Sequence, residues 1–494
     1  MATTVETNAL NTIDESERHG RPRDLFWPWF AANVSVLGLG YGAYLLAFGV
    51  SFWQAVAVGA VGIVASFLAC GFISLAGRRG SAPTMVLSRA AFGVDGNRLP
   101  SLLSWILTVG WETVLVALAT LATATVLGTL GWGGGTVTQV VTLAVVALVV
   151  VAAGIFGFQL VMKLQQVITV LTAVLTVVYV VLVAGHVDWA TVAAIPAGQA
   201  PQVIGGLVFM MTGFGLGWVN MAADYSRYLP RTASGAGVVG WTTFGASLPP
   251  VLLLVAGMLL AGSDPALADA IGADPIGALA VLLPEWFLIP FMVVALAGLI
   301  GGAALDIYSS GLALLSLGLP APRWVAAAID GVLMVLGATY VVFVADDFFG
   351  PFQGFLITLG VPIAAWCGVL LADIALRRKD YADDELADRR GRYGSVRWSA
   401  VLLVVAGTAI GWGLVTNTYA GWLSWQGYLL GPLGLGGRDG QWAGANLGVL
   451  VALALGLLGT FVLSARAVRR QESVQDSVQD SVQDSVQDSA QESA

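Results

Sequence analysis

Long apolar stretches alternate with short polar segments along most of the chain. Each stretch is close to the roughly 20 residues that a helix needs to cross the hydrocarbon core of a membrane. The pattern therefore predicts an all-α membrane protein with twelve transmembrane helices. The predicted spans are residues 26–50, 53–76, 100–128, 137–156, 160–185, 203–221, 238–262, 286–317, 324–344, 348–374, 398–419 and 443–465.

The composition excludes a soluble globular protein. Of the 494 residues, 57% are hydrophobic and 11% are charged, whereas a soluble domain carries about 25% charged residues. The cysteines, Cys70 and Cys367, are too few for a disulfide framework or a zinc site. Because the chain also has only two histidines, we expect no haem, no metal and no other cofactor. The lipid bilayer is the expected partner, and nucleic acid is not.

The basic residues predict how the chain is oriented. If the N-terminus is cytoplasmic, 21 of the 22 Lys and Arg residues fall in cytoplasmic segments, and only Arg438 falls outside. This strong positive-inside bias favours twelve spans with both termini in the cytoplasm. The first 25 residues are polar and do not resemble a cleavable signal peptide. The expected location is the cell membrane.

Two glycine motifs indicate an internal repeat. Residues 38–42 in the first span and residues 213–217 in the sixth both read Gly-x-Gly-x-Gly. Spans that are five apart cross the bilayer in opposite directions, as in an inverted repeat whose first helices are broken at the midplane. We therefore predict a LeuT-type five-plus-five inverted repeat with two extra C-terminal helices, and non-helical backbone at Gly40 and Gly215. Close helix packing at small residues is the alternative.

This repeat divides the chain into five parts. The tail is poor in hydrophobic residues and repeats Gln-Asp-Ser-Val, so we expect it to be disordered. The parts are a cytoplasmic N-terminal arm (1–25), a ten-helix transport core (26–374), a basic cytoplasmic loop (375–397), two appended helices (398–465) and an acidic tail (466–494).

Acidic residues within membrane spans are costly and usually functional. Glu112 lies in the third span and Asp306 in the eighth. Helical spacing predicts that each belongs to a polar stripe that lines a cavity. The stripes are Thr108, Trp111, Glu112 and Leu115, and Gly302, Asp306, Ser309 and Ser310. A structural hydrogen bond between helices is the alternative for either acid. Asp224 and Arg227 are interpreted as a gate interaction.

Two of the 17 tryptophans, Trp111 and Trp218, lie in the middle of spans rather than at the membrane interface. Their flat faces suit a planar heteroaromatic ligand, since stacking on an aromatic side chain contributes about 1–3 kcal/mol per base. Core filling is the alternative. The pair favours an uncharged ring over an amino acid, which would need partners for both of its charges.

Several strings resemble the nucleobase–cation symporter family, and in particular its purine–cytosine permease branch. They are Trp29–Asn33, Ser88–Gly93, Gly110-Trp111, Gly217-Trp218 and Ala222–Pro230. The resemblance covers about residues 20–465 and implies a LeuT-like symporter of a nucleobase or a related ring amide.

The resemblance also implies a substrate site and a coupling site. Trp111 and Trp218 match the stacking aromatics, Thr108 a polar contact, and Gly215 and Gly217 backbone donors to the ring. The predicted substrate site is Trp111, Trp218, Thr108, Gly110, Gly215, Gly217 and Glu112. The predicted cation or proton site is Asp306, Glu112, Asn33, Ser35 and Gly38.

One departure from the family bears on the coupled ion. Sodium-coupled members place hydroxyl side chains on the eighth span, where this chain has Gly301-Gly302-Ala303-Ala304. A hard cation requires several well-placed oxygens, so we expect proton coupling through Asp306, or through Glu112 as second choice. The alternative is sodium held by carbonyls of the first span and by Asp306.

Alternatives remain for the substrate and for the class of protein. The sequence does not distinguish cytosine from purines, and allantoin, hydantoin or another ring amide is the second candidate. A membrane-embedded enzyme is the alternative from a different class, but the chain lacks clustered catalytic residues. A channel is disfavoured because broken-helix repeats are typical of alternating-access carriers. The sequence leaves the oligomeric state open.

Overall fold

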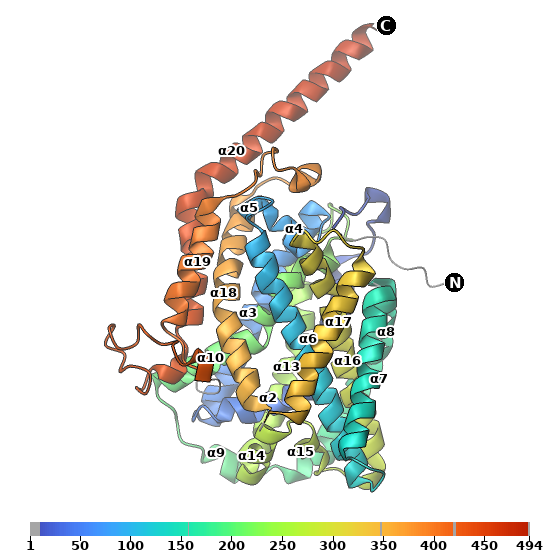
Figure 1. Cartoon of the computed structure of the whole chain (residues 1–494), viewed down its shortest axis with the longest axis vertical. Coiled ribbons are helices and arrows are strands. Elements are labelled where there is room, and N and C mark those ends of the chain that lie inside the picture. The colour runs from blue at the N-terminus through green and yellow to red at the C-terminus, as the bar shows by residue number, and fades with distance from the viewer. Residues whose placement is uncertain (1–9, 157, 346–347, 418–420, 493–494) are drawn as a thin grey trace.

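The protein is a bundle of long helices (Figure 1), described by a computed structural model that covers residues 10–156, 158–345, 348–417 and 421–492. No described residue belongs to a β-strand. Nine helical segments of this part of the chain are long and apolar enough to cross a membrane. They are α3 (Phe52–Gly80), α6 (Arg98–Thr129), α7 (Thr136–Phe156), the segment Ala200–Ser226, α13 (Gly235–Ser263), α16 (Glu285–Ser316), α17 (Arg323–Phe343), α18 (Phe349–Leu376) and the first part of α20 (Gly448–Glu492).

The other three predicted spans also coincide with helices. The first span is a bent pair, α1 (Phe26–Asn33) and α2 (Leu37–Leu46), with an angle of 68° at the break. The fifth corresponds to α8 (Phe158–Val183) and the eleventh to α19 (Trp398–Trp412), which has 15 residues. An all-helical membrane fold is thus confirmed, and the count of twelve spans stays a prediction.

Short helices connect the spans or follow a break. The α-helical ones are α4 (Thr84–Leu87), α5 (Arg89–Phe92), α9 (Trp189–Ala193), α10 (Ala200–Gly213), α11 (Gly215–Trp218), α12 (Ala222–Ser226), α14 (Pro265–Ala273) and α15 (Gly277–Ala280). The 3₁₀ turns are η1 (Glu15–Glu17), η2 (Pro22–Leu25), η3 (Ala184–His186), η4 (Val219–Met221), η5 (Asp383–Ala387), η6 (Gly421–Leu423) and η7 (Ala443–Ala445).

Local sequence signals explain where several helices begin. At the start of α3, Ser51 and Gln54 form a capping box in which each side chain accepts a hydrogen bond from the other residue's backbone N–H. After the break in the first span, the Ser35 hydroxyl accepts a hydrogen bond from Leu37 N, the first residue of α2, at 3.3 Å. Residues 34–36 therefore end one helix and start the next without glycine or proline.

The predicted position of the first break is wrong. Gly38, Gly40 and Gly42 all lie inside α2, and the non-helical residues precede them. These glycines allow close packing instead, because a Cβ on Gly42 would collide with the backbone of Gly257 and Met258 in α13. The alternative explanation, helix packing at small residues, therefore holds for the first motif.

The break in the sixth span does lie at its glycine motif. α10 ends at Gly213, Phe214 has φ −120° and ψ −108°, and α11 starts at Gly215. Gly215 is thus the first residue of the new helix rather than part of the non-helical backbone. The two breaks are alike in placing a non-helical residue next to the cavity described below.

The helices pack in two groups, and three further helices lie at one side of them. The first group contains α1, α2, α3 and α10–α13, and the second contains α6, α7, α8, α16 and α17. Helices α18, α19 and α20 pack against one another along one edge of the bundle, opposite α7 and α8 (Figure 1). Because α6 and α16 contact each other and α1 contacts both α13 and α16, the broken helices lie between the two groups.

The polar segments gather at one end of the bundle. Ile13 N in the N-terminal arm donates to Ser81 O at 2.8 Å, and Arg231 pairs with both Glu15 and Asp383 of the loop 375–397. Residues 1–9 of the arm lie outside the described part. These contacts bring the arm, the end of α3 and the loop together.

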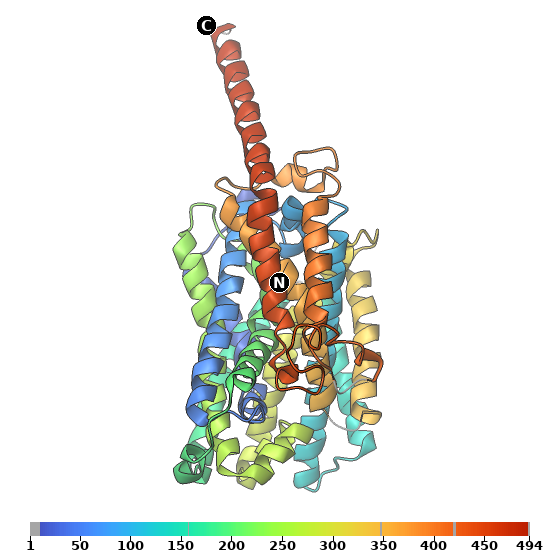
Figure 2. The same ribbon diagram turned by 90° about the vertical axis from the view of Figure 1, so that its left-hand side faces the viewer.

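The acidic tail, which was expected to be disordered, is helical in the structure. α20 continues as one helix through the predicted tail to Glu492 and projects away from the bundle (Figures 1 and 2). A helix that extends one already formed avoids the cost of nucleation, and the repeat contains no glycine or proline to stop it. Residues 493–494 lie outside the described part.

Candidate functional site

A small cavity lies between the two helix breaks and the middle of α6 and α16. Its volume is about 50 Å³, several times the volume that one water molecule requires. The residues around it come from both helix groups. They are Ala32, Asn33, Ser35, Leu37, Gly38, Tyr41, Trp111, Leu115, Gly213, Phe214, Trp218, Gly298, Gly302 and Asp306.

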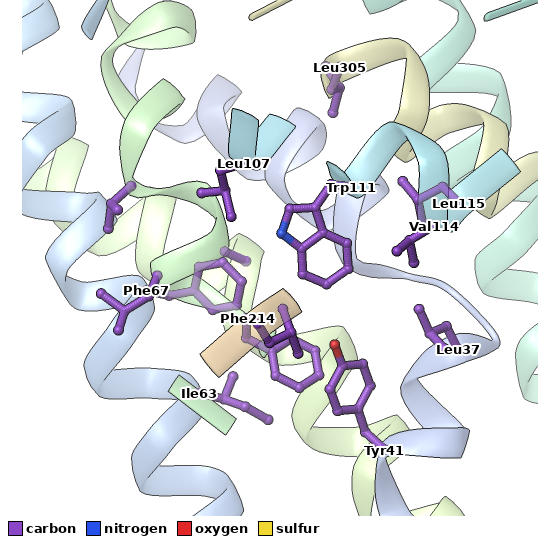
Figure 3. Packing of buried hydrophobic residues seen from close by; sticks show 14 of the residues in the cluster. Leu37, Tyr41, Ile63, Phe67, Leu107, Trp111, Val114, Leu115, Phe214 and Leu305 are labelled. Carbon is purple, nitrogen blue, oxygen red and sulfur yellow. The ribbon is translucent and has the colours of Figure 1, made fainter. Parts of the chain in front are cut away.

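Trp111 and Trp218, far apart in the sequence, both line this cavity. The Trp111 ring extends from α6 toward Tyr41 of α2 and Phe214 of the second break (Figure 3). It also makes an edge contact with Phe352 of α18, with ring centroids 5.5 Å apart. Trp218 packs edge-on against Trp29 of α1, with the two ring centroids 5.9 Å apart. Each indole is therefore held by other aromatic rings while part of it borders the cavity.

The Trp111 indole nitrogen is a free donor beside the cavity. It is buried and has no hydrogen-bond partner among the described residues. The nearest backbone is that of Gly217, where a Cβ would lie 2.9 Å from Trp111 Nε1. Gly217 thus leaves room for the tryptophan, and a side chain there would displace it. An unpaired buried donor is rare in proteins, and in this conformation the N–H lies against Gly217 rather than open to the cavity.

The first break supplies polar groups to the opposite wall of the cavity. Asn33, Ser35 and Gly38, all predicted for the coupling site, line it. Asn33 Nδ2 donates to Trp29 O at 2.9 Å, which leaves the amide oxygen of Asn33 without a described donor. On α16, Gly298 is so close to the break that a Cβ on it would lie 3.2 Å from Val34 O. Small residues on α16 therefore bring the broken helix against it.

Asp306 is the one acidic residue in the cavity wall as described. It is 2% exposed and lies one turn along α16 from Gly302, which also lines the cavity. None of the described residues forms an ion pair with it. A carboxyl group at this position can bind a proton or cation, or accept a hydrogen bond from a ligand.

Other predicted site residues do not reach the cavity. The Thr108 hydroxyl donates to its own helix, at 2.9 Å to Ser104 O and 3.1 Å to Trp105 O, as is common for threonine within membrane helices. A Cβ on Gly110 would collide with the ring of Phe355 in α18. Both residues therefore have packing roles in this conformation.

The expected backbone donors at the second break are already occupied. Gly215 N donates to Ser66 Oγ of α3 at 3.1 Å, and Gly217 N donates to Phe214 O at 2.9 Å. Gly215 also lies so close to α3 that a Cβ would collide with the backbone of Ser66 and Phe67. Neither amide is available to a ligand in this conformation.

Glu112 is next to Trp111 in sequence but faces away from the cavity. It is fully buried, and the charge that acts on it most strongly is that of Asp330 in α17. Adjacent helical residues differ by about 100° in direction, so Trp111 can line the cavity while Glu112 lies between helices. The stripe predicted on α6 is therefore divided between two environments.

The stripe predicted on α16 is divided in the same way. Gly302 and Asp306 line the cavity, but Ser309 Oγ donates to Asp224 of α12 at 2.8 Å, and Ser310 Oγ donates to Asp330 at 2.8 Å. The sequence spacing alone does not separate these roles, because the neighbours that receive the hydrogen bonds come from distant segments.

Between the cavity and the end of the bundle that carries the N-terminal arm, hydrogen bonds join the two helix groups. Besides the Ser309–Asp224 bond, Arg227 Nη2 donates to Tyr308 OH at 2.9 Å, and Asn220 Nδ2 donates to Ser104 Oγ at 2.9 Å. Asp224 also accepts from the backbone and hydroxyl of Thr84. These contacts close the end of the bundle that carries the arm and the loop 375–397, in line with a gate interaction at Asp224 and Arg227.

Sequence reasoning missed two aromatic residues of the cavity and one buried acid. Tyr41 and Phe214 lie between the glycines of the two motifs, and Tyr41 OH donates to Gly213 O at 3.1 Å. Their positions inside the motifs were a usable signal. Asp330 lies within the ninth predicted span, and the rule that identified Glu112 and Asp306 applies to it equally.

The chain matches a protein family over most of its length. The family model described as "Permease for cytosine/purines, uracil, thiamine, allantoin" matches residues 12–431. The chain belongs to this permease family. Its members are transporters, so the protein is a transporter and not an enzyme, and the resemblance found in the short motifs is confirmed.

Individual relatives of this permease agree with the assignment. The chain is 23% identical over 488 residues to a protein of Bacillus subtilis (strain 168) named putative purine-cytosine permease YxlA, covering 95% of this chain and 98% of the relative. Among solved structures, it resembles the nucleobase–cation symporter Mhp1 in a closed conformation with bromovinylhydantoin bound. That likeness has a TM-score of 0.67 and 17% identity, and covers 96% of this chain and all of that one.

Two further structures share the fold of the permease. Mhp1 in an inward-facing conformation is as similar as the closed form, with a TM-score of 0.68 at 17% identity over 95% of this chain and 96% of that one. A Na⁺-coupled sialic acid symporter is more distant and gives 0.53 at 13% identity over 90% of this chain and 98% of that one. The LeuT-type arrangement predicted from the paired glycine motifs is thus confirmed at the level of the fold, although the first motif is not the break itself.

Proposed function

We propose that this permease is a symporter that imports a nucleobase, such as cytosine or a purine, through the cavity between its two helix breaks. The observation that carries the proposal is the convergence of Trp111 and Trp218 on one cavity from opposite helix groups. Two indoles can hold a planar ring between them by stacking. The amide oxygen of Asn33 and the hydroxyl of Ser35 can then bond the edge of the ring.

A ring amide such as allantoin or a hydantoin is the second candidate substrate. It is favoured by the family description, which includes allantoin, and by the bromovinylhydantoin bound to Mhp1. Hydantoins and nucleobases share a planar ring with alternating N–H and C=O groups. The same stacking and edge contacts therefore serve either class.

We propose that protons, rather than sodium, drive the import. Gly301 and Gly302 of α16 carry no hydroxyl groups, so among the described lining residues α16 offers a hard cation only the carboxyl group of Asp306. The carboxyl group of Asp306 borders the cavity and can take up a proton on the same side as the substrate. Sodium held by Asp306 and by carbonyls of the first break is the competing proposal.

We further propose that the protein resides in the cell membrane with both termini cytoplasmic. The arm, the end of α3, the segment after α12 and the loop 375–397 meet at one end of the bundle, and that end is rich in arginine. Positive residues are retained on the cytoplasmic side.

Transport by the purified full-length protein in liposomes tests the proposal. Labelled cytosine, adenine, guanine, hypoxanthine, allantoin and hydantoin are each offered under an inward pH gradient in sodium-free buffer, with a sodium gradient at constant pH as the second arm. We expect accumulation of one of these unchanged rings under the pH gradient, and counterflow without any gradient. Chemical conversion of the ring, or uptake that requires sodium and ignores pH, would contradict the proposal.

A further inference from the structure

A second buried acidic site lies behind the cavity, among α6, α16 and α17. Asp330 of α17 is fully buried, and two side chains donate to its carboxyl group. Trp105 Nε1 of α6 donates to Oδ1 at 2.6 Å, and Ser310 Oγ of α16 donates to Oδ2 at 2.8 Å. Asp330 thus connects all three helices at one point.

Glu112 is the second acid of this site and is held very differently. It is fully buried, and neither of its carboxyl oxygens has a hydrogen-bond partner among the described residues. The hydroxyl of Ser310 is next to it, but that hydroxyl bonds Asp330 and the carbonyl of Ile307. Asp330 and Asp306 are the acidic residues that lie close enough to Glu112 to act on its charge.

The surrounding helices supply no described positive charge to neutralise the two acids. α7 and α15 contain no charged residue, and Asp373 of α18 is paired with Arg377 at 2.6 Å. Arg323, at the start of α17, donates to Gly154 O at 3.1 Å and lies over the ring of Tyr308. The site is therefore acidic and closed to water.

Two carboxylates cannot both stay ionised in such a place. Burial removes the water that stabilises each charge, and the charges repel each other. One proton shared by the two groups removes one charge and the repulsion together, as in other buried carboxyl pairs. Neither carboxyl oxygen of Glu112 accepts, from any described residue, a hydrogen bond that would stabilise a negative charge. Glu112 is therefore the group of the pair that is expected to be protonated.

We infer that Glu112 and Asp330 together bind one proton at a site separate from the substrate cavity, with the Ser310 hydroxyl between them. The inference rests on the proposed function in one respect, namely that this proton is the one that drives import. Asp330 is the acceptor that remains ionised, since two donors already point at it, and Glu112 carries the proton.

Asp306 connects this site to the cavity. Asp306 and Ser310 are one turn apart on α16 and so lie on neighbouring parts of one helix face. Asp306 borders the cavity, whereas Ser310 contacts the pair. A proton taken up by the Asp306 carboxyl from the cavity moves to the Glu112 carboxylate, which leaves Asp306 ionised and Glu112 neutral.

The position of Glu112 also links the proton to the substrate. Trp111 borders the cavity and Glu112 follows it on α6, so a movement of α6 when a ring binds Trp111 changes the distance between Glu112 and Asp330. Protonation of the pair favours one spacing and loss of the proton another. Substrate binding and proton binding then influence each other, as linkage requires.

Infrared difference spectroscopy of the full-length protein in lipid tests the pair directly and needs no transport. We expect a carbonyl band of a protonated carboxyl group in the wild type that is lost in Glu112→Gln, which removes the group that carries the proton. In Asp330→Asn the band should shift in frequency and in its titration, because Glu112 loses its charged neighbour. The band should persist in Asp306→Asn and in the control Asp274→Asn, an acid that bonds Thr125 away from the site. A band unchanged in both Glu112→Gln and Asp330→Asn, or no such band in the wild type, overturns the inference.

Ser310→Ala keeps the inference open to test if either acid variant fails to fold. It leaves both carboxyl groups in place and removes the hydroxyl between them. We expect the band to remain but to titrate at a different pH from the wild type. An identical titration means that Ser310 does not lie between the groups that share the proton, and the inference fails.

Transport measurements then decide whether this proton drives import. Under a gradient of about one pH unit with one proton per substrate, the wild type should accumulate substrate about tenfold, because a tenfold ratio corresponds to about 1.4 kcal/mol. Glu112→Gln and Asp330→Asn should lose this accumulation and keep counterflow. Full accumulation in both variants overturns the coupling role. A wild type without counterflow of any ring, together with the expected infrared result, contradicts the proposed function and leaves the proton-binding pair intact.

Discussion

At the scale of single residues, the most informative position is Trp111. Its ring borders the cavity, its indole nitrogen has no described partner, and the residue after it, Glu112, belongs to a different buried site. One turn of α6 thus contacts both proposed ligands. Asp306 has the corresponding position on α16, between the cavity and Ser310.

Replacing either cavity tryptophan by alanine should weaken substrate binding. Loss of stacking corresponds to about 1–3 kcal/mol, which is about five- to 150-fold in affinity. Trp111→Phe and Trp218→Phe should keep part of the affinity, because a smaller ring still stacks. Isothermal titration calorimetry with the transported ring measures the effect. Trp286→Ala is the control, since that side chain is 65% exposed at the start of α16. Unchanged affinity in folded Trp111→Ala would rule out the stacking proposal.

Asp306→Asn should uncouple the transporter without closing the substrate site. Asparagine has the same size and still offers a carbonyl oxygen, but it cannot exchange a proton in the physiological range. We expect accumulation under a pH gradient to be abolished and substrate exchange to remain. Uptake and counterflow assays in the same proteoliposomes compare the two activities. If Asp306→Asn still accumulates substrate as the wild type does, Asp306 does not take part in coupling.

At the scale of elements, the helix breaks in the two halves of the repeat are formed by different residues. In the first span, the Ser35 hydroxyl accepts a hydrogen bond from Leu37 N, and Gly38 and Gly42 pack against α13. In the sixth, Phe214 interrupts the helix between two glycines, and Gly215 packs against α3. Both breaks face α6 and α16, the helices of the other group. Movement between the groups therefore changes the cavity walls and the contacts beneath them.

Ser309→Ala should open the closed end of the bundle more often. It removes the hydrogen bond from α16 to Asp224 and leaves the bonds from Thr84 to Asp224 intact. One such bond contributes about 1 kcal/mol, so the open population should rise about fivefold.

Thiol labelling in the cavity measures how often the Ser309–Asp224 end of the bundle is open. With Cys70 and Cys367 replaced, a cysteine introduced at Ala32 in the cavity wall reacts with a membrane-impermeant thiol reagent added on the cytoplasmic face. The rate should rise in Ser309→Ala but not in the control Thr129→Val, whose hydroxyl bonds only its own helix. Equal rates in the two variants would show that the Ser309–Asp224 bond does not hold this end closed.

At the scale of the whole molecule, one polar cluster joins segments that are hundreds of residues apart. Arg231 contacts Glu15 of the N-terminal arm, Ser81 after α3 and Asp383 of the loop 375–397. Burial raises the pKa of Asp383 to about 6, although the positive charge of Arg231 opposes the change. The charge of Asp383 within this cluster therefore changes at a pH slightly below neutrality.

The stability of the folded protein should depend on Asp383 between pH 4 and 7. Its folded pKa of about 6 lies above the value of about 3.9 for a free aspartate. The folded state thus binds the proton more tightly, and the Asp383 contribution makes the protein more stable as the pH falls through 6 toward 4. Melting temperatures of the wild type and Asp383→Asn across this range measure the contribution. The difference between them should change as the pH falls from about 6 to about 4 and be constant above about pH 7. A difference that is constant with pH would contradict the assignment.

The sequence by itself determined the features that depend on composition and local order. Long uncharged stretches can lie only in a membrane, so the helices and their approximate bounds followed from hydropathy. The paired motifs indicated an inverted repeat because their separation of five spans is odd. Trp111 and Trp218 were recognisable because aromatic residues at mid-span are unusual, and the short strings around them identified the permease family.

Only the tertiary structure decided which side of each helix meets the cavity. The wall of the cavity is a narrow part of each helix surface, so neighbouring residues such as Trp111 and Glu112 enter different sites. Thr108 and Gly110 were predicted in the substrate site, but in this conformation their neighbours, the carbonyl of Ser104 and the ring of Phe355, are set by packing. The pairing of Glu112 with Asp330 depends on the contact of α6 with α17, segments more than 200 residues apart, which no local pattern specifies.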